Sequence, residues 1–202
     1  HLPDLRQSKM PLTLNFSLLQ DYFECPYRFK LSMFYGFQQP FSELMGYGNA
    51  LHDIVRNINL AAINGTPITD DFIQQTFDQV FYLPYAKHVQ YQRMLESAKR
   101  SIKKYVEHNA DKFGDIRLAE SQIEIDMGDG VTVNGRIDMV KEVEIDGQRK
   151  TVIVDFKTAN RRVLDAINTE QLRIYALGYQ RLTGGMADFM EIYHLDSENT
   201  AR

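Results

Sequence analysis

The chain has 202 residues, of which 44% are hydrophobic and 25% are charged, as expected for a globular protein with one sizeable core. No apolar stretch approaches the length of a membrane span and no signal peptide is visible, so we expect a cytoplasmic protein with no membrane partner. The net charge of −4 argues against a protein that coats nucleic acid, but it allows a local basic groove. Cys25 is the single cysteine, which excludes an internal disulfide, and one cysteine alone cannot hold a zinc or iron–sulfur site.

The beginning of the chain differs in character from the rest. Residues 1–13 are polar and contain prolines, so we expect them to form a tail. The opening "HLPDLRQSKM" has no initiator methionine, and we interpret the chain as a fragment of a longer protein. Residues 14–202 are expected to form one domain, with a mainly helical portion over 14–113 and a sheet core over 114–202.

The first half of the chain has the apolar spacing of helices. "NFSLLQDYFECPYRFKLSMFYG" predicts a helix that is interrupted at Pro26, because proline lacks an amide proton and clashes with the preceding turn. "ELMGYGNALHDIVRNINLAAING" predicts a stronger helix that ends at Gly65. One apolar stripe runs along it, made of Leu51, Ile54, Val55, Ile58, Ala61 and Ala62. Residues 70–82 and 86–112 predict two further helices.

From about residue 118 the pattern changes to the alternation of strands. Asp129-Gly130 and Asp146-Gly147 are turn signals typical of hairpins. "NTEQLRIYALGYQRLTGG" then predicts a helix and "ADFMEIYHL" a last strand. Helices followed by a strand meander, a helix and a strand predict an α/β (α+β) fold with a mixed sheet.

The second turn signal brings two acidic residues together. If Asp146-Gly147 forms a two-residue turn, the register of the flanking strands places Asp138 opposite Asp155. Their Cβ atoms would lie about 5 Å apart, where like charges destabilise the pair. A divalent cation would relieve the repulsion, and oxygen ligands favour magnesium, manganese or calcium. The alternative is an amphipathic hairpin whose charged face is solvated, and the spacing alone does not decide between the two.

Other polar residues are ambiguous when each is taken alone. His52 follows Gly48 by four residues beside the apolar stripe, where a histidine is more often structural than a ligand. Gln171 and Tyr175 lie one turn apart on one helical face, as a core-edge tyrosine and its polar neighbour would. Glu120 opens the first strand, where a solvated charge is the default.

Four short motifs follow one another in a fixed order: "GNALH" (48–52), "GRIDMV" (135–140), "VDFKT" (154–158) and "QLRIY" (171–175). This order resembles the RecB-like branch of the PD-(D/E)XK nuclease superfamily, whose marks are G-x-x-x-H, G-x-[IV]-D, D-x-K and Q-x-x-x-Y. "LNFSLLQDYFECPYRFKL" is similar to the first helix of that branch, with its C-P-x-x-[FY] pattern. The resemblance covers about residues 12–195. Ile137 replaces the proline that usually precedes the first acid, which leaves the ligands untouched.

The resemblance implies a restriction-endonuclease-like core, in which helices flank a mixed central sheet, with an N-terminal helical portion. It implies a Mg²⁺ or Mn²⁺ site whose ligands are His52, Asp138, Asp155 and the main-chain carbonyl of Phe156. Asp138 and Asp155 would also be catalytic, and Lys157 would orient the attacking water and offset charge on the phosphate.

Three further residues take supporting parts by the same resemblance. Glu120 would support the metal through water, and Gln171 and Tyr175 would contact the DNA backbone. Some relatives bind an iron–sulfur cluster with a cysteine that matches Cys25 and three others. This chain has no other cysteine, so we expect no cluster within it.

The resemblance also implies a biological setting. Members of this branch are commonly the nuclease module of an ATP-dependent superfamily-1 DNA helicase in recombination and repair. We therefore expect exonuclease action on single-stranded DNA, with a helicase motor in the same chain or in a partner. This chain has no G-x-x-x-x-G-K-[ST] motif. Two alternatives stay open: a stand-alone exonuclease, and a non-catalytic nucleic-acid-binding scaffold that retains the fold.

Overall fold

The computed structural model describes residues 11–37, 42–158 and 165–195, which form two compact units. The first unit comprises the described parts of residues 1–39, 122–136 and 164–186. The second comprises the described parts of residues 40–121, 137–163 and 187–202. Each unit is therefore assembled from separate stretches of chain, and each is described here by itself.

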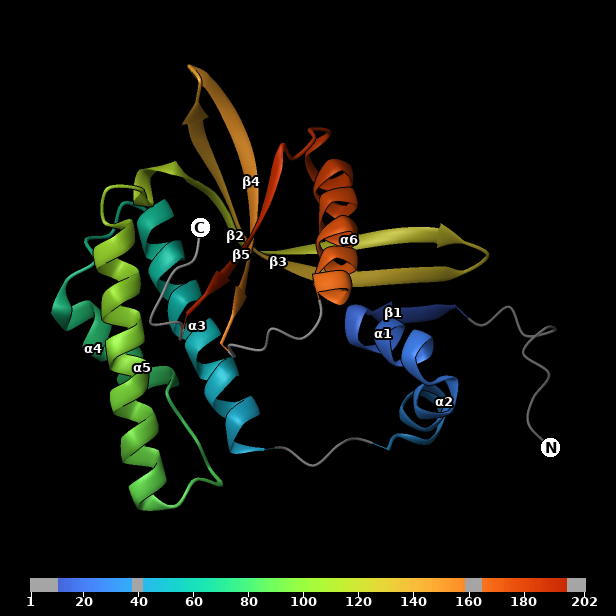
Figure 1. Cartoon of the computed structure of the whole chain (residues 1–202), viewed down its shortest axis with the longest axis horizontal. Coiled ribbons are helices and arrows are strands. Elements are labelled where there is room, and N and C mark those ends of the chain that lie inside the picture. Colours follow the sequence, from blue (N-terminus) through green and yellow to red (C-terminus); the bar gives the residue numbers. More distant parts are fainter. Residues whose placement is uncertain (1–10, 38–41, 159–164, 196–202) are drawn as a thin grey trace. The chain divides into compact units, whose positions relative to one another are not determined.

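Both units combine helices with strands (Figure 1). The first unit contains β1 (Leu12–Asn15), α1 (Phe16–Glu24), α2 (Pro26–Tyr35) and α6 (Asp165–Thr183). The second contains α3 (Glu43–Ile63), α4 (Asp70–Val80), α5 (His88–Asn109), the 3₁₀ turn η1 (Phe113–Asp115), β4 (Gln148–Lys157) and β5 (Phe189–His194). Strands β2 (Ile116–Gly128) and β3 (Val131–Ile145) each contribute residues to both units.

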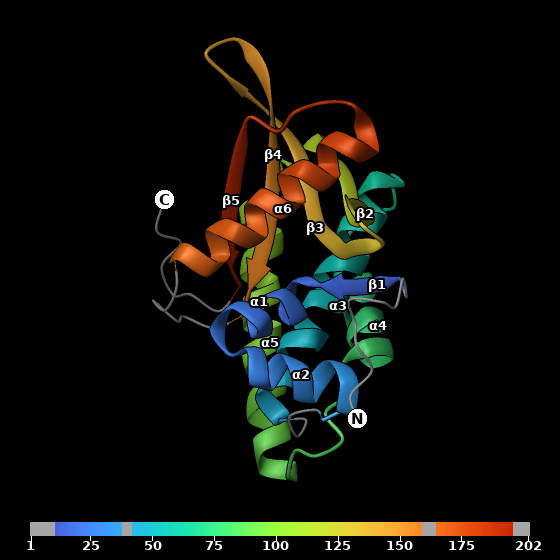
Figure 2. The same cartoon turned by 90° about the vertical axis from the view of Figure 1, so that its right-hand side faces the viewer.

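The strands form a mixed sheet, as the sequence predicts. Among the described residues the sheet has five strands in the order β1-β3-β4-β5, and β2 pairs with β3 off this path. β3 and β4 are antiparallel, whereas the pairs β1–β3 and β4–β5 are parallel. Figure 2 shows β3, β4 and β5 side by side. The fold is therefore of the mixed α/β type.

The turn at Asp146-Gly147 has the geometry that sets the predicted register. Asp146 has φ 52° and Gly147 has φ 72°, and two consecutive positive φ values are the mark of a two-residue hairpin turn. Ile145 consequently pairs with Gln148, and the pairing continues without a slip to Met139 and Val154. The register predicted for this hairpin is confirmed over that length.

The sequence prediction for the N-terminal segment is partly wrong. Residues 12 and 13 were assigned to a polar tail, but they belong to β1, in which Leu12 pairs with Val131 of β3. An apolar leucine and a β-branched threonine suit a strand better than a tail. Residues 1–10 lie outside the described residues. The predicted interruption at Pro26 is confirmed, because Cys25 is extended between α1 and α2 and proline fits the first position of a helix.

The core of the second unit lies between α3 and the sheet. The buried stripe of α3 packs with α4, α5 and the inner face of β4, and the three helices lie side by side in Figure 1. Tyr105 of α5 is 2% exposed, and its hydroxyl donates a 2.6 Å hydrogen bond to Asn59 Oδ1 of α3. Burial raises the pKa of Tyr105, so this hydroxyl stays protonated in the core. Among the described residues, no helix is both long and apolar enough to cross a membrane.

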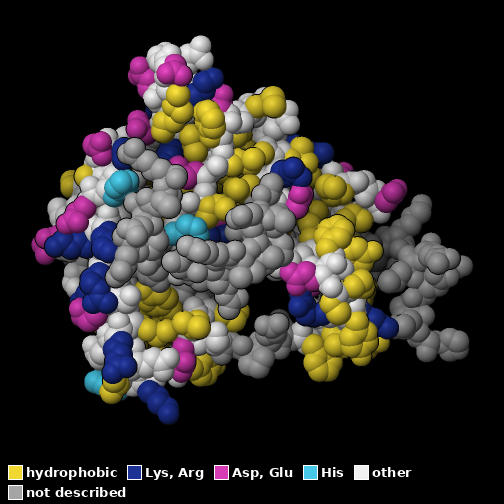
Figure 3. Space-filling view, viewed as in Figure 1, with side chains coloured by type: hydrophobic (Ala, Val, Ile, Leu, Met, Phe, Trp, Pro, Cys, Tyr) yellow, Lys and Arg dark blue, Asp and Glu magenta, His cyan; other side chains and the backbone are white. Residues whose placement is uncertain are grey.

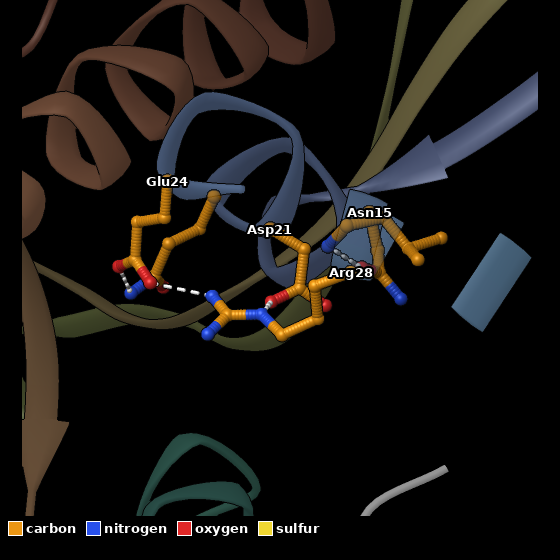
Figure 4. Close-up of polar contacts among 6 residues, drawn as sticks. Asn15, Asp21, Glu24 and Arg28 are labelled. Carbon is orange, nitrogen blue, oxygen red and sulfur yellow. Dashed lines mark hydrogen bonds and ion pairs between the residues drawn. The ribbon is translucent and has the colours of Figure 1, made fainter. Parts of the chain in front are cut away.

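Polar contacts fix the helix pair α1–α2 of the first unit (Figure 4). Asn15 caps α1 by accepting from the amide of Leu18 at 2.8 Å. Arg28 of α2 donates to Asp21 at 2.6 Å and also to Glu24, so it bridges both acids of α1. One arginine thereby offsets part of the negative charge of the two acids within the helix pair.

The helix pair α1–α2 also exposes many aromatic side chains. They are Tyr22, Phe23, Tyr27, Phe34, Tyr35 and, just beyond the helix, Phe37. Figure 3 shows hydrophobic side chains gathered over the part of the first unit where Figure 1 draws these helices. The surface of this helix pair is thus mainly apolar.

Helix α6 approaches β2 very closely at Gly178. A Cβ atom on Gly178 would lie 2.3 Å from Ile123 Cδ1 and 2.8 Å from Ile123 Cβ. These distances are far below normal van der Waals contact, so only a glycine allows this helix to pack against this strand.

We predict that Gly178→Ala destabilises the protein by about 1–3 kcal/mol, as overpacking does. The sign of the change in unfolding free energy is informative, because alanine in an ordinary helix interior is about 1 kcal/mol more favourable than glycine. Denaturant unfolding followed by circular dichroism measures the difference. Gly185→Ala is the control, since its nearest neighbour would lie at an ordinary 3.5 Å. An increase in stability on Gly178→Ala would show that the helix does not pack this closely.

Candidate functional site

Helix α3 brings His52 to the end of β4. The His52 side chain is 26% exposed, and its Nδ1 lies 3.8 Å from Oδ2 of Asp138 on β3. One turn earlier, a Cβ on Gly48 would lie 3.0 Å from Oγ1 of Thr158, just after β4. The glycine of the "GNALH" motif therefore permits the close approach that places His52 beside the sheet.

The two acids of the hairpin are both buried. Asp138 is 8% exposed and Asp155 is 3% exposed. Val140 and Ile153, which share their face of the sheet, are also buried. The alternative of a solvated charged face is therefore wrong for this part of the hairpin. Alternation could not reveal this burial, because a face is covered by elements that are distant in sequence.

The Asp138 side chain accepts a main-chain hydrogen bond just beyond the end of the β3–β4 pairing. The β3–β4 register ends at Met139 and Val154, and two residues beyond Val154 the amide of Phe156 donates a 2.8 Å hydrogen bond to Asp138 Oδ2. The bond holds one oxygen of Asp138 at the point where the two strands separate.

Asp155 is paired with Lys157 on the same strand. Lys157 Nζ lies 2.8 Å from Asp155 Oδ2, and the two residues share a face because they are two apart. The lysine side chain is 29% exposed, whereas the aspartate side chain is 4% exposed. The end of β4 therefore carries a buried anion, Asp155, paired with a partly exposed cation, Lys157.

The predicted metal ligands meet in pairs. His52 approaches Asp138, and Asp155 is held by Lys157. Within the described ranges, no group of three or more His, Cys, Asp or Glu side chains is arranged to hold a metal ion. The convergence of His52, Asp138 and Asp155 on one ion stays a prediction.

The chemistry of these groups nevertheless suits a divalent cation. Two buried carboxylates lie beside an imidazole and beside the main chain of Phe156, with one lysine to offset their charge. Buried anions are costly unless they are paired, and carboxylate, carbonyl and imidazole donors suit magnesium or manganese. The residues present therefore fit such an ion by donor type.

Glu120 has an unusual backbone conformation for a strand residue. Its φ is 54°, in the left-handed region that non-glycine residues seldom adopt, and it lies within β2. Such a conformation costs about 1–2 kcal/mol and is often found at functional sites. The support that we expect Glu120 to give a metal stays a prediction.

Gln171 and Tyr175 are joined on α6, in the first unit. Gln171 Nε2 donates a 2.6 Å hydrogen bond to the Tyr175 hydroxyl, as their spacing of one turn allows. Tyr175 is buried, with a ring atom that would lie 3.5 Å from a Cβ on Gly135. The contact of this pair with the DNA backbone stays a prediction.

Sequence reasoning gave no role to two residues that lie beside Gly48 and Lys157. Thr158 was not considered, although its hydroxyl lies against Gly48. His194 was not considered either, although it is the direct partner of Lys157 on β5. No local turn fixes the register of β5 against β4, so nothing in the sequence could have placed His194.

A comparison with known families identifies the superfamily of the chain. The family model described as the PD-(D/E)XK nuclease superfamily matches residues 13–201. No match is found among curated proteins. The mixed five-stranded sheet of the described residues, with its helices, is consistent with the restriction-endonuclease-like fold. Since the match covers nearly the whole chain, this protein belongs to the PD-(D/E)XK nuclease superfamily.

Proposed function

We propose that this chain is a metal-dependent DNA nuclease domain of the RecB-like branch, which hydrolyses phosphodiester bonds in single-stranded DNA as an exonuclease. Membership of the superfamily supports a nuclease with DNA as its substrate, and nucleases of this superfamily generally use divalent metals. One observation carries the proposal: two buried carboxylates lie where β3 and β4 separate, next to the partly exposed Lys157.

The ligands of the ion would be His52, Asp138, Asp155 and the carbonyl of Phe156. Bound there, Mg²⁺ or Mn²⁺ would polarise the scissile phosphate and lower the pKa of a coordinated water. The hydrogen bond from the Phe156 amide holds one oxygen of Asp138 in place, which reduces the reorganisation needed for binding.

Lys157 would act on the substrate. Its ammonium group, which lies 2.8 Å from Asp155 Oδ2, would orient the attacking water and offset the negative charge that develops on the phosphate. Glu120 would support the ion through water, and Gln171 with Tyr175 would contact the DNA backbone.

The setting that we propose is a cytoplasmic helicase–nuclease of DNA recombination and repair. The order of the four motifs supports the RecB-like branch, in which a helicase motor commonly accompanies the nuclease. The net charge of −4 also supports it, because phosphate contacts provide most non-specific affinity for DNA and an acidic module has few to offer. A motor that feeds the strand would supply the effective concentration that the module lacks.

We predict that Mn²⁺ raises the melting temperature of the wild-type chain and not that of Asp138→Asn. A ligand that binds only the folded state stabilises it by about 2.7 kcal/mol at 100 times its Kd. Each kcal/mol corresponds to roughly 2–4 °C for a chain of this size. Asparagine keeps an oxygen that can accept from the Phe156 amide, so the variant should fold without metal.

The control for the metal experiment is Glu144→Gln, which removes an exposed acid from the same strand and should keep the full shift. Differential scanning fluorimetry with and without MnCl₂ gives all three values. An equal shift in Asp138→Asn and wild type would place the ion elsewhere.

We predict that Lys157→Ala keeps the Mn²⁺-induced shift and loses cleavage. A charged lysine cannot ligate a metal, so its removal should reduce kcat about 10²–10³-fold while metal binding persists. Release of nucleotides from a labelled single strand in MgCl₂ measures the rate. Lys150→Ala, near the other end of β4 and paired with Asp188, should cleave at the wild-type rate. Wild-type cleavage by Lys157→Ala would refute the role assigned to this lysine.

The same assay tests the type of activity. We expect the wild-type chain to shorten linear single strands from an end and to leave closed circular single strands intact, because an exonuclease needs a terminus. Cleavage of the circle would show endonuclease action. Binding of DNA without any cleavage in Mg²⁺ or Mn²⁺ would favour the non-catalytic scaffold.

A further inference from the structure

We propose that His194 is a second phosphate-binding residue, which donates a hydrogen bond to the DNA backbone beside Lys157. The inference rests on the proposed nuclease function and adds a substrate contact from β5 that none of the four motifs contains. It follows from the register of two parallel strands, the face on which their side chains lie, and the chemistry of the neighbouring groups.

The register brings His194 next to Lys157. Along the β4–β5 pair, Asp155 lies beside Ile192, Phe156 beside Tyr193 and Lys157 beside His194. The pairing continues past this point, because the amide of Leu195 donates a 2.8 Å hydrogen bond to the carbonyl of Lys157. The position of His194 is therefore fixed by hydrogen bonds on both sides of it.

The rings of the intervening pair show which way these side chains point. Phe156 and Tyr193 are in ring contact at 5.7 Å, and both rings also contact Tyr105 in the core, at 5.7 and 5.6 Å. Successive residues of a strand point to opposite faces. Lys157 and His194 consequently lie on the other face, which is the face of Asp155.

The position along the strands also favours a ligand site. Lys157 and His194 are the last residues of β4 and β5, so both lie at the carboxyl ends of parallel strands. Ligands of α/β sheets commonly bind at such ends. Adjacent strands are about 4.8 Å apart, which lets both side chains reach the same stretch of a sugar-phosphate backbone.

The chemistry of the pair is complementary. Lys157 supplies a point charge, whereas an imidazole offers a directed N–H donor. Nδ1 of His194 is buried, so the nitrogen that would donate to the phosphate is Nε2. Ile192, beside Asp155, can donate nothing, so His194 is the polar group that β5 contributes next to the acid and the lysine. A phosphate oxygen is an acceptor that both donors would satisfy.

The test compares the wild-type protein with three variants at position 194. His194→Gln keeps an N–H donor of similar reach, His194→Phe keeps an aromatic ring without a donor, and His194→Ala removes both. His108→Ala is the matched control, because His108 is exposed on α5. For each protein we would measure kcat and KM on a labelled oligothymidylate in MgCl₂, and Kd for the same strand by fluorescence anisotropy in EDTA.

If the donor contacts phosphate, His194→Ala and His194→Phe should raise KM and Kd about ten- to a hundredfold, as expected for a lost hydrogen bond to a charged group. His194→Gln should restore most of the loss, and His108→Ala should equal wild type. Wild-type values for His194→Phe, with a loss in His194→Gln, would show that the ring only packs and would overturn the inference. Wild-type values for every variant would overturn it as well.

The wild-type protein separates this inference from the proposed function. If it cleaves the strand while the variants at position 194 behave like it, the nuclease function stands and the role of His194 fails. If it binds the strand without cleaving it, the nuclease proposal fails, and the anisotropy series still decides whether His194 contacts phosphate. If it neither binds nor cleaves the strand, both proposals fail.

Discussion

The burial of two carboxylates at the end of one hairpin is the constraint on which the site depends. Asp138 and Asp155 are nearly inaccessible to water, and an ionised carboxylate in such a place must be compensated by hydrogen bonds or by charge. The chain compensates each acid differently. Asp138 accepts the Phe156 amide near His52, and Asp155 lies against Lys157. Three groups with a proposed part in catalysis thus contact one of the two acids. His52 and Phe156 contact Asp138, and Lys157 contacts Asp155.

Each buried acid is compensated by a group of the chain itself. The ion pair with Lys157 neutralises Asp155, the more deeply buried acid. The other acid, Asp138, accepts a hydrogen bond from the main-chain amide of Phe156. Lys157 is thus the charge partner of the more deeply buried acid.

The hairpin could be predicted because its register follows from a local signal. Asp146 and Gly147 both have positive φ, which aspartate and glycine tolerate, and the pairing then runs without a slip to Met139. The helix containing His52 was equally accessible, since its apolar stripe has the helical period over several turns. These two elements place His52, Asp138, Asp155 and Lys157, so much of the site follows from local patterns.

What the sequence could not reveal depends on contacts between distant segments. The β4–β5 pair is parallel and has no tight turn to fix its register, so the neighbour of Lys157 was unknown. Residues 12 and 13 of the short strand β1 were assigned to a tail, because the pairing of β1 with β3 joins residues far apart in the chain. The approach of Gly48 to Thr158 was hidden for the same reason, since the two residues are distant in sequence. In each case the missing information is tertiary.

The division of the chain into two units that interleave along the sequence limits how this protein can be dissected. Each unit draws on three separate stretches, and β2 and β3 cross from one unit to the other within a single strand. No contiguous segment therefore contains one unit complete without also containing part of the other. The natural minimal piece for expression is one that keeps every described strand from β1 to β5, because only such a piece preserves the whole sheet.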